Sequence, residues 1–173
     1  MAEAAVAINE AGYSSGGKLA IGGNTEQFLT FTLGAEEYGV DIMMVREVKG
    51  WTETTRLPNT PEYIRGVLNL RGIIIPIFDL RARFTGQLTN PDAKNVVVIL
   101  AVGDRTIGIL ADTVSDILTV GSDEIKPAPE TDNAVDKHFV SGLIAVEGRM
   151  VVLLDIGKLL DPHDLEIAPQ SVN

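Results

Sequence analysis

The sequence predicts a mainly β protein made of two small barrels packed side by side, with short helices and an internal duplication. Three observations predict this fold: a β-branched composition, apolar residues that alternate with polar ones, and landmarks that recur at fixed spacing. Of the 173 residues, 33 are Ile or Val and only 5% are aromatic. Such a composition favours strands over helices, and the length suits one domain or two closely joined small ones.

A hairpin is predicted at the start of each half. Residues 28–33 alternate between apolar and polar, Gly34 begins a turn, and a second strand follows at 37–40. The same order recurs at 95–102 and 106–110, with Gly103 and Asp104 as the turn. Two runs of period two joined by a glycine turn are typical of β-hairpins.

The two halves share landmarks in the same order. Five pairs are 69 positions apart and three are 76 apart: Gly34 and Gly103, Gly39 and Gly108, Val45 and Val114, Glu47 and Asp116, Pro58 and Pro127, then Gly66 and Gly142, Gly72 and Gly148, Asp79 and Asp155. This order indicates an internal duplication with a unit of roughly 60–70 residues. The second copy carries seven extra residues, which we place in the polar stretch 128–137.

Short helical turns are expected at three places. Thr60 and Pro61 are typical of a helix start, with Gly66 as its end. Asp79 is expected to cap residues 80–84, which Gly86 ends, and Asp155 to cap 156–160, which Pro162 ends.

Two apolar runs, 73–77 and 150–154, lack clean alternation. We expect both faces of these strands to be buried, one inside a barrel and the other against the sister barrel, with one shared core between the two. Pro76 lies within the first run and cannot donate to a ladder, so an edge or a bulge is expected there.

The predicted organisation is a flexible arm at 1–25, a folded region at 26–161 and a short polar tail at 162–173. Within the folded region, the first barrel repeat is expected at about 26–90 and the second at about 94–161. The first residues lack the basic start and continuous apolar segment of a signal peptide, so we expect a cytoplasmic protein.

The composition excludes several kinds of chemistry. The chain has no Cys and two His, His138 in the insertion loop and His163 in the tail, so thiol chemistry is excluded and a His-based metal cluster or catalytic His is disfavoured. Its net charge of −10 argues against nucleic acid as a partner. No phosphate-binding or calcium-loop pattern occurs. We therefore expect no metal and no cofactor.

Carboxylate pairs are the remaining candidates for catalysis. Asp41 with Asp112, or Asp79 with Asp155, could perform acid–base chemistry. Helix capping explains Asp79 and Asp155 fully and is favoured over catalysis. A small β-barrel enzyme that uses carboxylates therefore stays a remote alternative to a protein-binding scaffold.

One turn stands out as a candidate interaction site. Asn69, Leu70, Arg71 and Gly72 lie between two apolar strands, and the equivalent turn has Glu147 where the first has Arg71. In the separate segment 45–48, Val45 and Val48 are expected to point inward and Glu47 outward. Glu47 would form a bidentate pair with Arg71 if the two meet. An ordinary exposed turn arginine is the alternative interpretation.

These segments resemble the CheW family of chemotaxis adaptors. The resemblance covers about residues 26–161 and is carried by four stretches: FTLGAEEYGVDI at 31–42, NTP at 59–61, IRGVLNLRG at 64–72 and IPIFDLR at 75–81. In the second half, residues 114–116 and 126–129 also match. A CheV-like coupling domain or a fragment of the kinase regulatory domain is the nearer alternative.

The resemblance implies two SH3-like five-stranded barrels and a non-enzymatic adaptor. Its implied partners are the cytoplasmic tip of methyl-accepting chemoreceptors and the regulatory domain of the histidine kinase CheA. It places Arg71 at the coupling surface with Glu47 as its charged partner, beside Asn69 and Gly72, and it places Val45 and Val114 in an apolar receptor groove. We further expect a monomer in isolation that joins ring-like arrays with its partners.

Overall fold

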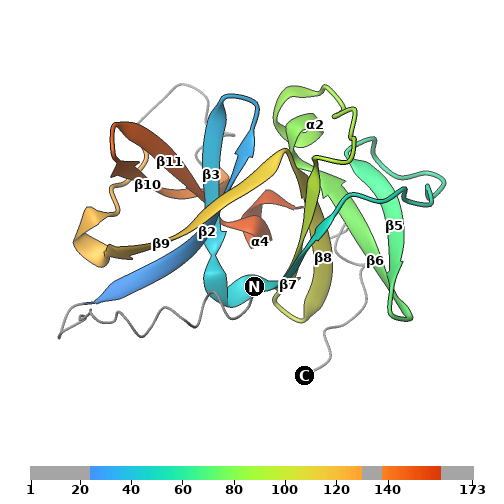
Figure 1. Cartoon of the computed structure of the whole chain (residues 1–173), viewed down its shortest axis with the longest axis horizontal. Coiled ribbons are helices and arrows are strands. Elements are labelled where there is room, and N and C mark those ends of the chain that lie inside the picture. Colours follow the sequence, from blue (N-terminus) through green and yellow to red (C-terminus); the bar gives the residue numbers. More distant parts are fainter. Residues whose placement is uncertain (1–23, 130–137, 161–173) are drawn as a thin grey trace.

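The computed structural model describes residues 24–129 and 138–160. They form two five-stranded sheets that lie side by side (Figure 1). The first sheet has the order β10-β11-β3-β2-β9, with the bounds Val140–Val146, Arg149–Leu154, Glu36–Asp41, Thr25–Leu33 and Thr113–Gly121. The second has the order β4-β7-β8-β6-β5, with the bounds Val45–Gly50, Val96–Val102, Arg105–Ala111, Ile73–Asp79 and Ile64–Leu70. The predicted mainly β fold is confirmed.

Each sheet takes strands from both halves of the sequence. The hairpin β2–β3 of the first half joins β9, β10 and β11 of the second, and the hairpin β7–β8 of the second half joins β4, β5 and β6 of the first. The repeats expected at about 26–90 and 94–161 therefore do not coincide with the sheets. Hydrogen bonding decides this, because β3 pairs in parallel with β11 and β8 pairs in parallel with β6.

The strand pairing repeats the predicted offsets. Leu153 opposes Gly39 in the first sheet, and Ile77 opposes Gly108 in the second. Leu153 lies 76 positions after Ile77, and Gly108 lies 69 positions after Gly39, so the two pairings are equivalent. The bridge between Lys126 and Leu143 is equivalent to the bridge between Thr55 and Val67. The spacing between equivalent residues is therefore already 71 at Lys126. Two of the seven extra residues thus precede residue 126, where a 3₁₀ turn, η2 (Ser122–Glu124), is inserted. Placing all seven within 128–137, and pairing Pro58 with Pro127, was wrong.

Three apolar clusters lie among the residues that the structure describes. One lies within the second sheet and includes Leu68, Ile75 and Ile77, and another lies within the first and includes Phe28 and Ile144. The largest, which we name the shared core, joins buried residues of both sheets: Leu29, Phe31, Leu33 and Val40 of the first, and Val98, Leu100, Ile107 and Ile109 of the second, among others. The expected shared core between the two units is confirmed.

The apolar runs are only partly as expected. Ile75, Ile77 and Phe78 are buried on opposite faces of β6. Ile73 and Ile74, however, are 42% and 47% exposed, and Met150 of β11 is 52% exposed, so the expectation of full burial was wrong for the starts of both strands. These residues follow the hairpin turns, where the strands extend past their parallel neighbours. Pro76 has a pairing partner in β5 only, as its missing N–H requires.

A glycine at a bulge helps bring the two ends of each sheet together. Single bridges join β5 and β10 to the segments that follow the opposite edge strands, through Thr55 and Val67 and through Lys126 and Leu143. Gly66 next to Val67 has φ +133°, and a Cβ there would clash with the carbonyl oxygen of Thr55. The edges therefore meet at one bridge in each sheet rather than along a continuous ladder.

Two of the three predicted helical turns are present. Helix α2 (Leu80–Thr85) begins at the Asp79 cap and ends at Gly86, and α4 (Ile156–Leu159) begins at the Asp155 cap. The helix expected after Thr60 is absent: residues 58–63 form only turns, because β5 begins at Ile64. The expected arm, tail and Pro162 lie largely or wholly outside the described residues, as does most of the insertion loop.

A polar contact fastens the two sheets beside the shared core. Asp112, after β8, accepts bonds of 2.6 and 2.7 Å from Nη2 of Arg81 in α2 and one of 2.7 Å from the amide of Gly34, at the β2–β3 turn. Partial burial raises the pKa of Asp112, but the hydrogen bonds from Arg81 and Gly34 outweigh it and hold this pKa below its ordinary value. The carboxylate therefore stabilises the fold at neutral pH, and this stability is lost as pH falls through the lowered pKa.

We predict that Asp112→Asn lowers the free energy of unfolding at pH 7 by about 1 kcal/mol, allowing for solvent screening. The loss should shrink as the pH falls below 3.8, the ordinary value for this carboxyl. Urea unfolding at pH 7 and at a pH below 3.8 measures this loss. Asp104→Asn, at an exposed turn, is the control. A loss that is independent of pH would contradict the assignment of charge to Asp112.

The exchange of hairpins also predicts one cooperative unfolding transition. Ile144→Ala lies in the cluster of the first sheet and should cost about 2–5 kcal/mol. Trp51, the single tryptophan, packs on the cluster of the second sheet, so its fluorescence should report the same shifted midpoint as circular dichroism. Separate midpoints for the two signals would show that the sheets unfold independently.

Candidate partner-binding surface

The turn between β5 and β6 consists of Arg71 and Gly72, both with positive φ, 53° and 89°. Oδ1 of Asn69 accepts a 2.8 Å hydrogen bond from the amide of Gly72. Two left-handed residues make the tight hairpin turn whose twist suits the flanking strands. The equivalent turn also has positive φ at Glu147 and Gly148, so the backbone of this turn belongs to the fold and the side chains distinguish the two copies.

The arginine of this turn forms an ion pair with Glu47. Nη2 of Arg71 donates a 2.7 Å hydrogen bond to Oε1 of Glu47. The contact is a single bond rather than the expected bidentate fork. Glu47 lies on β4 and Arg71 follows β5, which are the two edge strands of the second sheet, so the pair joins these edges on the outside of the sheet.

The pair is accessible and charged at neutral pH. The side chain of Arg71 is 72% exposed and that of Glu47 is 32% exposed. The hydrogen bond from Arg71 lowers the pKa of Glu47, and the same bond raises the pKa of the guanidinium. The pairing therefore persists at neutral pH and is lost only as the pH falls through the lowered pKa of Glu47. An exposed pair of this kind adds little to stability.

Val45 and Val114 occupy equivalent bulges on edge strands. Val45 pairs with Leu100 and Glu47 with Ile99, which leaves Arg46 as the extra residue of β4. The same irregularity makes Ser115 the extra residue of β9. A bulge shifts the alternation by one residue, which explains how side chains three positions apart can share a face.

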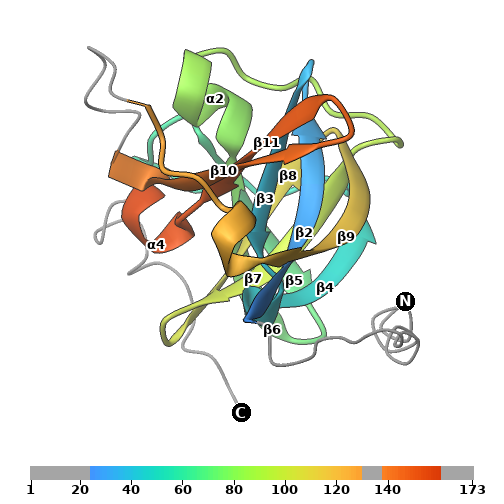
Figure 2. The same ribbon diagram turned by 90° about the vertical axis from the view of Figure 1, so that its left-hand side faces the viewer.

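Four partly buried side chains consequently rest against the shared core: Val45 and Val48 of β4, and Val114 and Ile117 of β9. We name this set the apolar strip. Figure 2 shows β4 and β9 on the same side of the molecule. The inward direction expected for Val45 and Val48 is confirmed, and the strip is where the shared core reaches the surface at the two edge strands.

The corresponding end of the first sheet carries different groups. Nε of Arg149 donates a 2.6 Å bond to Oε1 of Glu37, and its Nη1 lies 3.8 Å from Glu147. The equivalents of Arg149 and Glu37 in the second sheet are Ile73 and Thr106. Sequence reasoning missed both this ion pair and the exposed Ile73 and Ile74, because alternation cannot show where a strand projects beyond its neighbours.

The carboxylates considered for catalysis have structural partners. Asp79 accepts bonds from the amides of Ala82 and Thr89, and Asp155 accepts one from the amide of Lys158. Asp41 accepts one from Met43, whereas Asp112 binds Arg81, so Asp41 and Asp112 do not act as a pair. Within residues 24–129 and 138–160, no group of three His, Cys or carboxylate residues could hold a metal ion. In the same ranges no helix is long and apolar enough to cross a membrane.

Comparison with known proteins identifies the family. Residues 27–163 match the model of the CheW-like domain. The chain belongs to the CheW-like family. It is 44% identical to the chemotaxis protein CheW of Klebsiella aerogenes over 91% of this chain and 95% of that protein. It is 39% identical to the probable chemotaxis protein CheW of Rhizobium etli, over 82% and 92% of the two chains.

The fold agrees with this assignment. The crystal structure of the scaffolding protein TtCheW from Thermoanaerobacter tengcongensis matches with a TM-score of 0.75 and 28% identity, over 83% of this chain and 99% of that one. The resemblance to CheW adaptors is thereby confirmed. The near-complete coverage of CheW proteins favours this class over a CheV-like domain, a kinase fragment or a carboxylate enzyme.

Proposed function

We propose that this CheW-like scaffold couples methyl-accepting chemoreceptors to the regulatory domain of the histidine kinase CheA. The accessible ion pair between Arg71 and Glu47, beside an apolar strip, is the observation that carries the proposal. Arginine at an interface provides directional hydrogen bonds, and rim charges set partner choice and orientation. Asn69 and Gly72 fix the turn that presents the arginine.

The apolar strip suits the receptor. An amphipathic helix binds by laying apolar side chains into a hydrophobic groove, and the apolar strip offers such a surface to a helix of the receptor. Val45 and Val114 each leave part of their surface exposed while they rest on a rigid core. A contact that needs no rearrangement of the core retains more of its binding energy.

The proposed role requires no catalysis, and it places the chain in the cytoplasm, at receptor clusters under the inner membrane through its partners. The capping and pairing of Asp41, Asp79, Asp112 and Asp155 support a non-enzymatic role. The net charge of −10 disfavours nucleic acid as a partner.

Arg71→Ala tests the coupling surface. Because the side chain is exposed and its loss leaves the turn backbone unchanged, we expect Tm to change by less than about 2 °C. Pull-down of CheA and a receptor fragment should weaken at least about tenfold if Arg71 lies in the contact. Thermal melts and pull-downs on the same preparation measure both effects.

Glu147→Ala is the matched control for this variant. Glu147 holds the equivalent position of the second turn, with nearly the same φ. Its removal should leave the contact made through Arg71 intact. Unchanged binding by the Arg71 variant, or equal losses from both variants, would contradict the proposal.

The two non-identical ends predict how the scaffold assembles. One end carries Arg71, Glu47 and exposed Ile73, and the other carries Arg149 and Glu37. Contacts between unlike surfaces are heterologous and form rings or open chains, and weak single contacts gain strength through multivalency. The purified chain should therefore be monomeric in light scattering and should join ring-like arrays only with CheA and receptors. A stable symmetric homodimer through these ends would refute this.

A further inference from the structure

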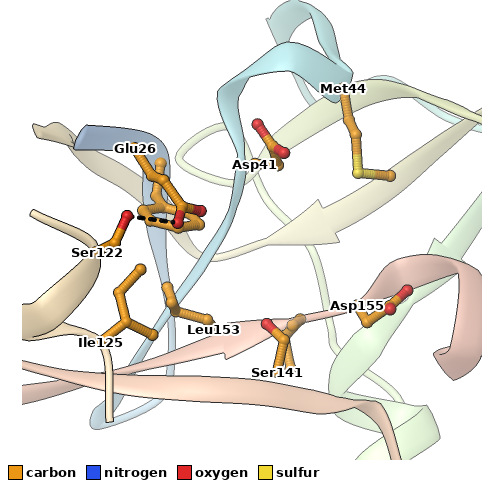
Figure 3. A pocket seen from close by; sticks show the side chains of 10 residues that line it. Glu26, Asp41, Met44, Ser122, Ile125, Ser141, Leu153 and Asp155 are labelled. Atoms are coloured by element: carbon orange, nitrogen blue, oxygen red, sulfur yellow. Dashed lines mark hydrogen bonds between the residues drawn. The ribbon is translucent and has the colours of Figure 1, made fainter. Parts of the chain in front are cut away.

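A cavity of about 420 Å³ opens beside the first sheet, away from the Arg71 turn. It is lined by side chains from several strands and loops, among them Glu26, Phe28, Asp41, Ser141, Leu153 and Asp155. Figure 3 shows the carboxylates of Glu26, Asp41 and Asp155 around this space, with Leu153 and Ile125 along its wall. None of these described lining residues carries a positive charge.

The internal duplication shows what occupies the equivalent place in the second sheet. There, Nη1 of Arg65 lies 3.5 Å from the carboxylate of Asp79, which is completely buried. The guanidinium of Arg65 also lies 6.0 Å from the centre of the Trp51 ring. One repeat of this fold therefore holds an arginine side chain against the carboxylate at the end of β6.

The second repeat keeps the carboxylate and lacks the arginine. Residues 65 and 79 correspond to Ser141 and Asp155, each 76 positions later, and β5–β6 and β10–β11 have the same register, with a bulge at the same place. Ser141 and Asp155 both line the cavity. The cavity thus lies where the first repeat places the side chain of Arg65, and Asp155 is partly exposed where Asp79 is buried.

Charge complementarity specifies the missing occupant. Glu26 and Asp41 add two exposed carboxylates to that of Asp155, so the rim attracts a cation, and Phe28 and Leu153 offer apolar surface to the methylene stem of a long side chain. Asp41 caps η1 (Ile42–Met44), and Met44, the last residue of η1, directly precedes Val45 of the apolar strip.

We propose that this cavity is a docking site for an arginine or lysine side chain presented by a protein partner. The bound cation takes the place that Arg65 has in the other repeat, with Asp155 as its principal counter-ion. The proposal concerns cation recognition and does not depend on which partner the Arg71 surface binds.

The probe is Nα-acetyl-arginine methylamide, titrated into the isotope-labelled full chain and followed by NMR. We expect saturable shifts of the amides of Ser141 and Asp155 at millimolar concentrations. Nα-acetyl-norleucine methylamide, which has a similar stem and no charge, should leave them unchanged. Absence of saturable shifts with the arginine probe, or equal shifts with both probes, would overturn the proposal.

Ser141→Arg tests whether the chain can fill the site itself. If the second repeat lacks only the arginine, this variant should raise Tm by about 2–4 °C and abolish probe binding, whereas the neutral control Ser141→Gln should do neither. A folded Ser141→Arg variant that binds the probe as the wild type does would reject the site.

Asp155→Asn decides the matter if Ser141→Arg fails to fold. Asparagine also caps helices well, so α4 should be retained while the charge is lost. Affinity for the arginine probe should fall about three- to fivefold, the effect of one partly screened charge. Affinity equal to that of the wild type would overturn the proposal.

Discussion

The shared core is the constraint on which the rest of the structure depends. Each half of the sequence donates its first hairpin to the sheet of the other half, and the faces of these hairpins that meet one another, through Phe31, Val40, Leu100 and Ile109, are buried in one cluster. Neither sheet is complete without strands from both halves. The two units are therefore fixed relative to each other by hydrogen bonding between strands and by burial. The contact of Asp112 with Arg81 and Gly34 also joins them.

Because the sheets are fixed relative to each other, the exposed groups on them keep constant positions. The apolar strip lies on the edge strands β4 and β9, so its two parts keep a constant spacing only because both strands rest on the shared core. Glu47 and Arg71 join the two edges of one sheet. In the other sheet, Arg149 at the start of β11 pairs with Glu37 of β3. A scaffold that holds several partners at once needs this kind of preorganisation, because flexible surfaces pay ordering entropy for every contact.

The sequence allowed prediction of features that depend on local rules. Alternation predicted both hairpins, capping chemistry predicted α2 and α4, and the landmark offsets predicted the duplication. The exchange of hairpins was not predictable, since a repeat shows which segments are alike and not which edges pair. The proximity of Glu47 and Arg71, 24 residues apart, was open for the same reason, as was the exposure of Ile73 and Ile74, whose composition matches that of the buried residues after them.

Duplication followed by divergence at a few surface positions explains how one fold can serve unlike contacts. The pairing register, the bulges and the left-handed turn residues are kept in both copies, because each is required by the backbone. The backbone does not require particular side chains at these positions. Arg71 of the first turn is replaced by Glu147 in the second, and Arg65 is replaced by Ser141 near a carboxylate that both copies keep. Where one copy satisfies a charge internally and the other leaves it open to solvent, the open position is available to another molecule. The same backbone thus carries different charged groups in its two copies: Arg65 lies beside Asp79 in one, and Asp155 lies beside Ser141 without that arginine in the other.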